Sequence, residues 1–329
     1  MDNTSSTGSE DMFGYREIHG YISTIVCSIG VMLNIVNYLA WTRQSASVSD
    51  TLLASLGVTD GLALLSYLIF NVYFYHVSGP YVSVYHSEAG MKMVIICFHA
   101  YIIFHMLSNF LTVALAVIRY FHVCRRCAKT EICKMKITRF IMVSGVLSVL
   151  LATLPFYFYY EVYDLADQST NKTGFWIRKS NFADNHVHEY QVPILWVYGV
   201  VFKILPCALM IALSGYMVKS IREAKRKKDQ MTTSSDISTT KKSSVEYNKT
   251  TLMLIIIVMI YVLSEIPIAI SAFISGLQRA ESHFFYFLLF SSVGEVMDLI
   301  TILNATSNFF IYFTMCKKYR QNIKLLFQL

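Results

Sequence analysis

Long apolar runs separated by short polar segments recur along the whole sequence. A helix that crosses a bilayer needs about 20 mostly apolar residues. Hydrophobic residues make up 55% of the chain and charged residues 15%, against about 25% charged in a typical soluble domain. The sequence therefore predicts an all-α membrane protein, a seven-transmembrane helix bundle. Its expected spans lie near residues 19–42, 50–76, 90–121, 138–160, 191–218, 250–276 and 285–315.

The distribution of lysine and arginine predicts which way the bundle faces. With the N-terminus outside, the cytoplasmic segments hold 20 of these residues and the outer segments hold 6. Membrane proteins carry such an excess on the cytoplasmic side. The bias also accounts for the net charge of +7 without a nucleic-acid partner. We expect a multi-pass plasma-membrane protein with an extracellular tail over residues 1–18 and the bundle over 19–315.

Several segments outside the spans have expected properties of their own. Residues 220–249 are rich in Lys, Ser and Thr, which predicts a flexible cytoplasmic loop, either a phosphorylation target or a plain linker. Residues 316–329 pair a basic face with an apolar face, which suits a helix on the inner membrane surface among lipid headgroups. Cys316 is a candidate for palmitoylation. Asn3 and Asn171 stand in glycosylation motifs on the outer side.

Five short motifs resemble those of rhodopsin-class G-protein-coupled receptors, each in its expected span. They are Leu33–Asn37, Leu56–Asp60, Ala116–Tyr120, Pro206 and Asn308–Tyr312. Two longer strings, Tyr198–Pro206 and Ser264–Pro267, resemble invertebrate FMRFamide and myosuppressin receptors and the related W-class serpentine receptors of nematodes. Phe309 departs from the pattern, because the family usually has proline at that place.

The resemblance implies a function as well as a fold. It implies an extracellular neuropeptide ligand, often ending in Arg-Phe-amide, and signalling through a heterotrimeric G protein of the inhibitory type. It further implies an activation switch, whose residues in this sequence are Arg119, Tyr120, Pro267, Asn308 and Tyr312.

The outer loop departs from the family. Residues 161–189 contain no cysteine, so the usual disulfide between this loop and the third helix cannot form. We therefore expect a mobile lid over the ligand pocket.

Asp60 leads the first group of polar residues expected inside the membrane. An ionisable group in hydrocarbon is costly, so it needs partners or a cavity. If the family packing holds, Asp60 faces Ser108, Asn304 and Asn308, a cluster that binds sodium in that family. Side-chain oxygens suit a hard cation. The alternative is a hydrogen-bonded polar core without an ion.

A second group comprises His105, Lys203 and Glu265, which the family packing brings together below the ligand. We expect Lys203 and Glu265 to form a buried pair, with His105 adding a hydrogen bond. Such a pair is better suited to specifying a conformation than to adding stability, which makes it a candidate switch. The alternative is a static ion pair that only packs the bundle.

The expected mouth of the pocket carries two acids of the last span. Glu295 and Asp298 are three residues apart and share a helix face. They could receive a cationic ligand group such as arginine through a bidentate contact, or be solvated acids at a helix end. Tyr101 could line the same pocket or face lipid as an interfacial aromatic residue.

Rival functions are less consistent with the sequence. Residues 285–315 contain no lysine for a retinal Schiff base, which argues against an opsin. Repeated halves, common in transporters, are not evident, and no nucleophile–base pattern suggests an enzyme. The strongest alternative is a chemosensory receptor for an environmental small molecule.

Overall fold

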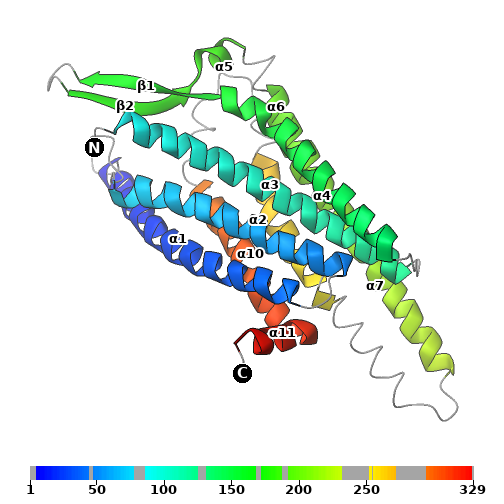
Figure 1. The fold of residues 1–329 in the computed structure, drawn as a ribbon. Helices are drawn as coiled ribbons and strands as arrows, with labels where there is room; N and C mark the ends of the chain where they lie inside the picture. Colours follow the sequence, from blue (N-terminus) through cyan, green and yellow to red (C-terminus); the bar gives the residue numbers. More distant parts are fainter. Residues whose placement is uncertain are drawn as a thin grey trace.

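The computed structural model describes residues 5–43, 47–77, 86–124, 131–167, 172–186, 192–231, 252–253, 255–271 and 294–327. Long helices lie side by side, with a two-stranded hairpin at one end of the bundle and a short helix across the other (Figure 1). The long helices are α1 (Ser5–Thr42), α2 (Val48–Asn71), α3 (Glu88–Cys124), α4 (Glu131–Thr153), α7 (Leu205–Met231) and α10 (Gly294–Met315).

Within the described part of the chain, six helical stretches are long and apolar enough to cross a membrane. They run over Ile18–Thr42, Val48–Val77, Glu88–Phe121, Lys136–Phe158, Val197–Ser220 and Gly294–Met315. The helix Ile255–Ser271 is a shorter apolar helix in the place of the sixth expected span. The predicted seven-helix membrane bundle is therefore confirmed.

Irregular helical segments extend several of these helices. A π-helix, η1 (Val72–Val77), continues α2, and another, η4 (Val197–Ile204), joins the short α6 (Val192–Trp196) to α7. A 3₁₀ turn, η2 (Leu154–Phe158), follows α4 and contains Pro155 near its start. Because π-helical turns in proteins often occur at functional sites, η4 is a segment of interest.

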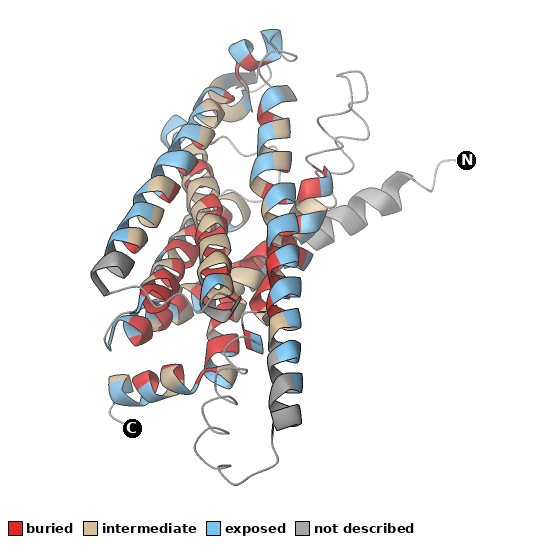
Figure 2. Cartoon of the chain, turned by 90° about the vertical axis from the view of Figure 1, so that its right-hand side faces the viewer, coloured by how far each residue is buried: buried red, intermediate tan, exposed pale blue. Residues whose placement is uncertain are grey.

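Side-chain burial follows the arrangement of the helices. Buried positions gather between the helices, whereas exposed positions follow the outward sides of the peripheral helices (Figure 2). Many exposed residues are large and apolar, such as Ile25, Phe140 and Leu151. In a membrane-spanning chain these side chains face lipid. The largest buried cluster lies toward the inner end and includes Trp41, Leu111 and Tyr312.

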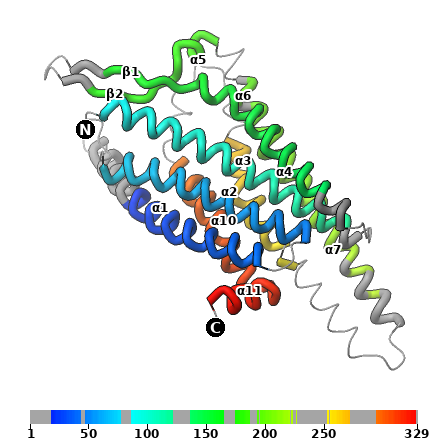
Figure 3. The backbone as a smooth tube through the Cα atoms, viewed as in Figure 1, coloured from blue at the N-terminus to red at the C-terminus, as the bar shows by residue number. Residues whose placement is uncertain are grey.

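The inner end is closed by α11 (Lys317–Phe327), which leaves α10 and lies beside the end of α1 (Figure 3). The Tyr319 hydroxyl donates to Asn37 Oδ1 at 2.5 Å, and Asn322 Nδ2 donates to the Ala40 carbonyl at 2.8 Å. Lys318 Nζ pairs with Asp50 Oδ2 at 2.7 Å. These contacts fix the short helix to α1 and to the start of α2.

Several expected boundaries differ from the structure. Helix α1 begins at Ser5, within the expected tail, and α7 continues to Met231, within the expected 220–249 loop, because its Lys- and Arg-rich end is compatible with a helix. Cys316 is only 8% exposed and its burial raises the pKa of the thiol, which disfavours palmitoylation. Asn3, Asn171 and residues 232–249 lie outside the described residues.

Candidate ligand-binding and switching site

Three buried ionisable side chains meet in the middle of the bundle. Lys203 Nζ donates to Glu265 Oε2 at 2.5 Å and lies 2.9 Å from His105 Nε2, which is itself 3.0 Å from Glu265 Oε1. Lys203 and Glu265 are 0% exposed. We call His105, Lys203 and Glu265 the triad. Charges buried this deeply are tolerated only when they are paired with good geometry.

Different elements position each member of the triad. His105 comes from α3, Lys203 from the last turn of η4 and Glu265 from the helix Ile255–Ser271. Lys203 and Gly199 are the buried residues of η4, so the lysine occupies the inward side of that π-helix. Pro267 follows Glu265 by two residues and removes one helical N–H donor. The triad therefore joins three helices next to a proline.

The hydrogen bonding of His105 has two forms. When Nε2 carries no proton, it accepts from the Lys203 ammonium. When Nε2 carries the proton, it donates to Glu265 Oε1. Asn109 Nδ2 lies a further 3.3 Å from the same nitrogen. The Nε2 atom of His105 can thus bind either the Lys203 ammonium or the Glu265 carboxylate. Its protonation decides which of these two hydrogen-bonding states forms.

The acids of the expected mouth are held by tyrosines. Tyr75 Oη donates to Glu295 Oε1 at 3.3 Å, and Tyr67 hydrogen-bonds the Asp298 carboxylate. Tyr67 Oη also lies 3.2 Å from His19 Nε2. These contacts bring the start of α10 together with α1, α2 and η1 at the outer end of the bundle.

Packed aromatic side chains connect Asp298, at the outer end of the bundle, with the triad. The ring centroids of Tyr67 and Tyr101 are 5.3 Å apart, and Tyr101 stacks on His105 at 5.8 Å with 14° between the ring planes. Offset and stacked pairs at such distances attract one another. A change at Asp298 therefore has a contiguous route of packed side chains to the triad.

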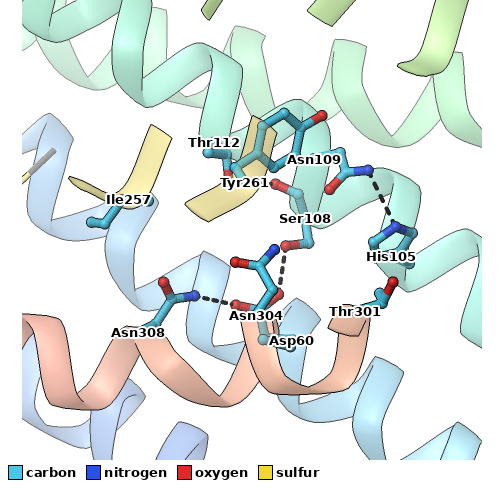
Figure 4. A pocket seen from close by; sticks show the side chains of 11 residues that line it. Asp60, His105, Ser108, Asn109, Thr112, Ile257, Tyr261, Thr301, Asn304 and Asn308 are labelled. Carbon is cyan, nitrogen blue, oxygen red and sulfur yellow. Dashed lines mark hydrogen bonds between the residues drawn. The ribbon is translucent and has the colours of Figure 1, made fainter. Parts of the chain in front are cut away.

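Asp60 sits deeper, in a second polar cluster (Figure 4). Ser108 Oγ donates to Asp60 Oδ1 at 2.5 Å, and Asn308 Nδ2 donates to Asp60 Oδ2 at 2.8 Å. A cavity of about 20 Å³ lies beside them, bordered also by Asn304, Asn109 and the triad member His105. The Asp60 cluster and one member of the triad, His105, therefore border the same small cavity.

The residues around Asp60 have the donor types that sodium requires. They offer one carboxylate, the Ser108 hydroxyl and the amide oxygens of Asn304 and Asn308, and hard cations prefer such oxygens. The cavity has room for one particle of about the size of a water molecule. Sodium at Asp60 remains a prediction.

The remaining switch residues lie toward the inner end. Arg119 and Tyr120 are half-buried near the end of α3, where the Tyr120 ring meets Tyr216 of α7 edge to face at 6.1 Å. Tyr312 is buried and meets Trp41 edge to face at 5.5 Å. Both contacts lie toward the inner end of the bundle, and the role of these residues in activation stays a prediction.

The outer loop forms an antiparallel hairpin of β1 (Tyr160–Asp167) and β2 (Lys172–Lys179). The Phe175 N–H donates to the His86 carbonyl at 3.1 Å, and the Trp176 ring packs 4.9 Å from the His86 ring. Burial lowers the pKa of His86. The described part of the loop is therefore a hairpin that contacts the start of α3, and the mobile lid stays a prediction.

Three contact residues were not singled out by sequence reasoning. Tyr75 binds Glu295, Asn109 reaches His105, and Tyr198 places its ring centroid 5.2 Å from Lys203 Nζ. The signal for Asn109 was present, because it follows His105 by four residues and so lies on the same helix face. Tyr75 lies in a π-helical segment, where α-helical spacing misplaces side chains.

Comparison with known proteins agrees with the fold and with the motifs. The family model described as serpentine type 7TM GPCR chemoreceptor Srw matches residues 21–329. The chain is also 24% identical to the G-protein coupled receptor dmsr-1 of Caenorhabditis elegans, over 95% of this chain and 68% of that protein. The predicted receptor class and multi-pass plasma-membrane location are therefore confirmed, and an enzyme is not indicated. This chain belongs to the Srw family of serpentine seven-transmembrane G-protein-coupled receptors.

Proposed function

We propose that this receptor binds an extracellular peptide that ends in Arg-Phe-amide and signals through an inhibitory-type heterotrimeric G protein. The observation that carries the proposal is the pair of acids on α10, Glu295 and Asp298, each hydrogen-bonded to a tyrosine at the outer end of the bundle. A guanidinium group suits two neighbouring carboxylates because its planar fork donates to both.

The tyrosines beside these acids support the second half of the ligand motif. Tyr67 and Tyr101 offer aromatic faces next to Asp298, and a phenylalanine ring would add to their stack. Tyr101 also stacks on His105. A ligand that shifts Tyr101 would therefore bias which partner His105 binds, and so the orientation of the helix Ile255–Ser271 that carries Glu265.

A chemosensory role for an environmental small molecule is the alternative. It is favoured by the description of the matching family as chemoreceptors. The two roles differ in what the outer acids do. A peptide cation needs both carboxylates, whereas an uncharged small molecule needs neither.

The test measures G-protein activation in cells that express the intact chain. Three peptides of one length are compared: one ending in Arg-Phe-amide, one with citrulline for arginine, and one with a free carboxylate. The variants are Glu295→Gln and Asp298→Asn, which keep size and remove charge. Glu88→Gln is the matched control, because Glu88 is an exposed acid at the start of α3 that pairs with Lys92 one turn away.

We expect saturable activation by the amidated arginine peptide alone. Asp298→Asn and Glu295→Gln should each raise the half-maximal concentration about tenfold to a hundredfold, the loss expected for a charge-assisted hydrogen bond worth about 1.5–3 kcal/mol. Glu88→Gln should respond as the unaltered receptor does. Equal responses to the arginine and citrulline peptides would contradict a role for the acids. Silence toward all peptides at normal surface levels would favour the chemosensory role.

The G-protein type needs a separate measurement. The response should disappear after treatment with a toxin that ADP-ribosylates inhibitory-type α subunits. A response that persists would leave the peptide assignment intact and reject the inhibitory coupling.

A further inference from the structure

A second cavity, larger than that at Asp60, opens on the flank of the bundle between α3, η2 and η4. Its volume is about 310 Å³, which is within the usual range of small-ligand pockets. Its lining is mainly apolar and includes Met106, Ala152, Phe156, Ile194, Tyr198 and Phe202. None of the residues assigned to ligand recognition or to the triad lines this side cavity.

We propose that the side cavity binds an acyl chain of a membrane lipid, and that the bound chain steadies the triad through Tyr198. The argument begins with the surface around the opening. Leu151 of the rim is 71% exposed, and Val197 is 45% exposed. Next to them, Leu154 and Val201 are also exposed. The opening is therefore continuous with the lipid-facing surface of the bundle.

The walls are chemically suited to a hydrocarbon occupant. Pro155 and Pro193 contribute to the lining, and proline has no backbone N–H that would require a hydrogen-bond partner in lipid. The 3₁₀ turn η2 and the change from α6 to the π-helix η4 occur at the same level. The irregular turns η2 and η4 lie on two sides of the side cavity. Regular α-helices at these places would pack more closely and fill it.

Tyr198 connects this cavity to the triad. Its ring is part of the cavity wall, packs edge to face on Phe156 at 5.9 Å, and has its centroid 5.2 Å from Lys203 Nζ. A cation at that distance from an aromatic ring is attracted to it. If the ring turned into the empty cavity, Lys203 would lose this contact. An acyl chain in the cavity keeps the ring in place and so favours the paired state of Lys203 with Glu265.

The test uses the full-length receptor in nanodiscs of phosphatidylcholine doped with the same lipid carrying a diazirine in mid-chain. Cross-linked residues are located by mass spectrometry. Ala152→Phe fills the cavity with a ring. Ala208→Phe is the matched control, because Ala208 is exposed on α7 and does not line the cavity. Ala152→Leu replaces the phenylalanine variant if that variant does not reach the membrane.

We expect cross-links concentrated on η2 and on Val192–Phe202. Ala152→Phe should reduce them at least about tenfold, or about 1.4 kcal/mol of binding free energy, while Ala208→Phe leaves them unchanged. Excess lipid should also raise the thermal unfolding temperature of the detergent-solubilised receptor, and should no longer do so in Ala152→Phe. Label spread evenly over all lipid-facing helices would overturn the proposal. The proposal would also be overturned if short apolar compounds reduced the cross-linking and an excess of unlabelled lipid did not.

Discussion

Asp60 and Glu265 are both buried carboxylates of the bundle, but they are satisfied in opposite ways. Glu265 is paired with the Lys203 ammonium and approached by His105. Asp60 accepts hydrogen bonds from the uncharged donors Ser108 and Asn308. Asp60 lies in the stretch Val48–Val77 and Glu265 in the shorter apolar helix Ile255–Ser271, and both are nearly inaccessible. One acid has its counter-charge within the protein, whereas the other is stabilised by dipoles and borders a cavity.

The two clusters therefore neutralise a buried acid in different ways. The triad contains its own neutralising charge, so its geometry decides which helices come together. Among the described residues, Asp60 has only uncharged hydrogen-bond donors as partners, and we predict that a proton or a cation balances its charge. Asn109, which contacts His105 and lines the Asp60 cavity, lies between the two clusters.

Removing the cation from the triad should have the largest effect. Lys203→Met leaves Glu265 buried without its partner, which typically costs about 3–5 kcal/mol. We expect a lower unfolding temperature and little receptor at the cell surface. The double variant Lys203→Met with Glu265→Met should recover most of the loss, because it leaves no unpaired charge.

The charge swap Lys203→Glu with Glu265→Lys checks direct pairing. It should be more stable than either single substitution. If the unfolding temperature of the swapped receptor is no higher than that of the less stable single variant, Lys203 and Glu265 do not pair directly. The contrast drawn with Asp60 is then wrong.

Neutralising Asp60 should have a smaller and conditional effect. If sodium binds here, replacing choline chloride by sodium chloride at equal ionic strength should stabilise the receptor, by about 1–3 kcal/mol when sodium well exceeds its dissociation constant. Asp60→Asn should abolish that salt-specific gain. Glu265→Gln should retain it. A sodium effect that survives in Asp60→Asn would place the ion elsewhere.

Changing Asn109 should affect the connection between the clusters more than either cluster alone. Asn109→Leu keeps the approximate volume and removes a neutral hydrogen bond, with an expected cost of about 1 kcal/mol. In a double-mutant cycle of Asp60→Asn with Glu265→Gln, measured by thermal unfolding, the coupling energy should shrink in this background. Thr301→Val, which also lines the cavity, is the control and should leave the coupling unchanged.

The smallest expected effect concerns a buried group outside the spans. His86 is 5% exposed and its burial lowers the pKa from 6.5, so the imidazole is favoured in its neutral form when the hairpin is docked. Neutral His86 therefore stabilises the docked hairpin fully above about pH 6.5. This contribution is lost as the pH falls through the lower pKa that His86 has when the hairpin is docked. Hydrogen exchange at the Phe175 amide, corrected for intrinsic rates, should quicken at low pH.

His86→Phe keeps an aromatic ring against Trp176 and cannot titrate. In this variant, hydrogen exchange at the Phe175 amide should not depend on pH once the intrinsic exchange rates are corrected for. If the unaltered receptor and His86→Phe show the same pH dependence, a group other than His86 is responsible.

Hydropathy predicted the spans well, because burial in lipid demands long apolar runs whatever the partners. The resemblance also brought His105, Lys203 and Glu265 together correctly in space. The hairpin was missed, because its strands are stabilised by pairing with each other and by a contact with His86 that is distant in sequence. The π-helical segments were missed because their residues have no distinctive pattern. Tyr75 and Tyr198, which both lie in such segments, were missed with them.

The anchoring of the hairpin has a consequence for how the receptor matures and survives outside the cell. Its contacts with the bundle include a backbone hydrogen bond to His86, the packing of Trp176 on His86 and Phe74, and the packing of Tyr160 on Phe98. Residues 161–189 contain no cysteine. Folding of this region therefore needs no oxidase or disulfide isomerase in the secretory pathway. Thiol reductants in the surroundings should leave its ligand pocket unchanged.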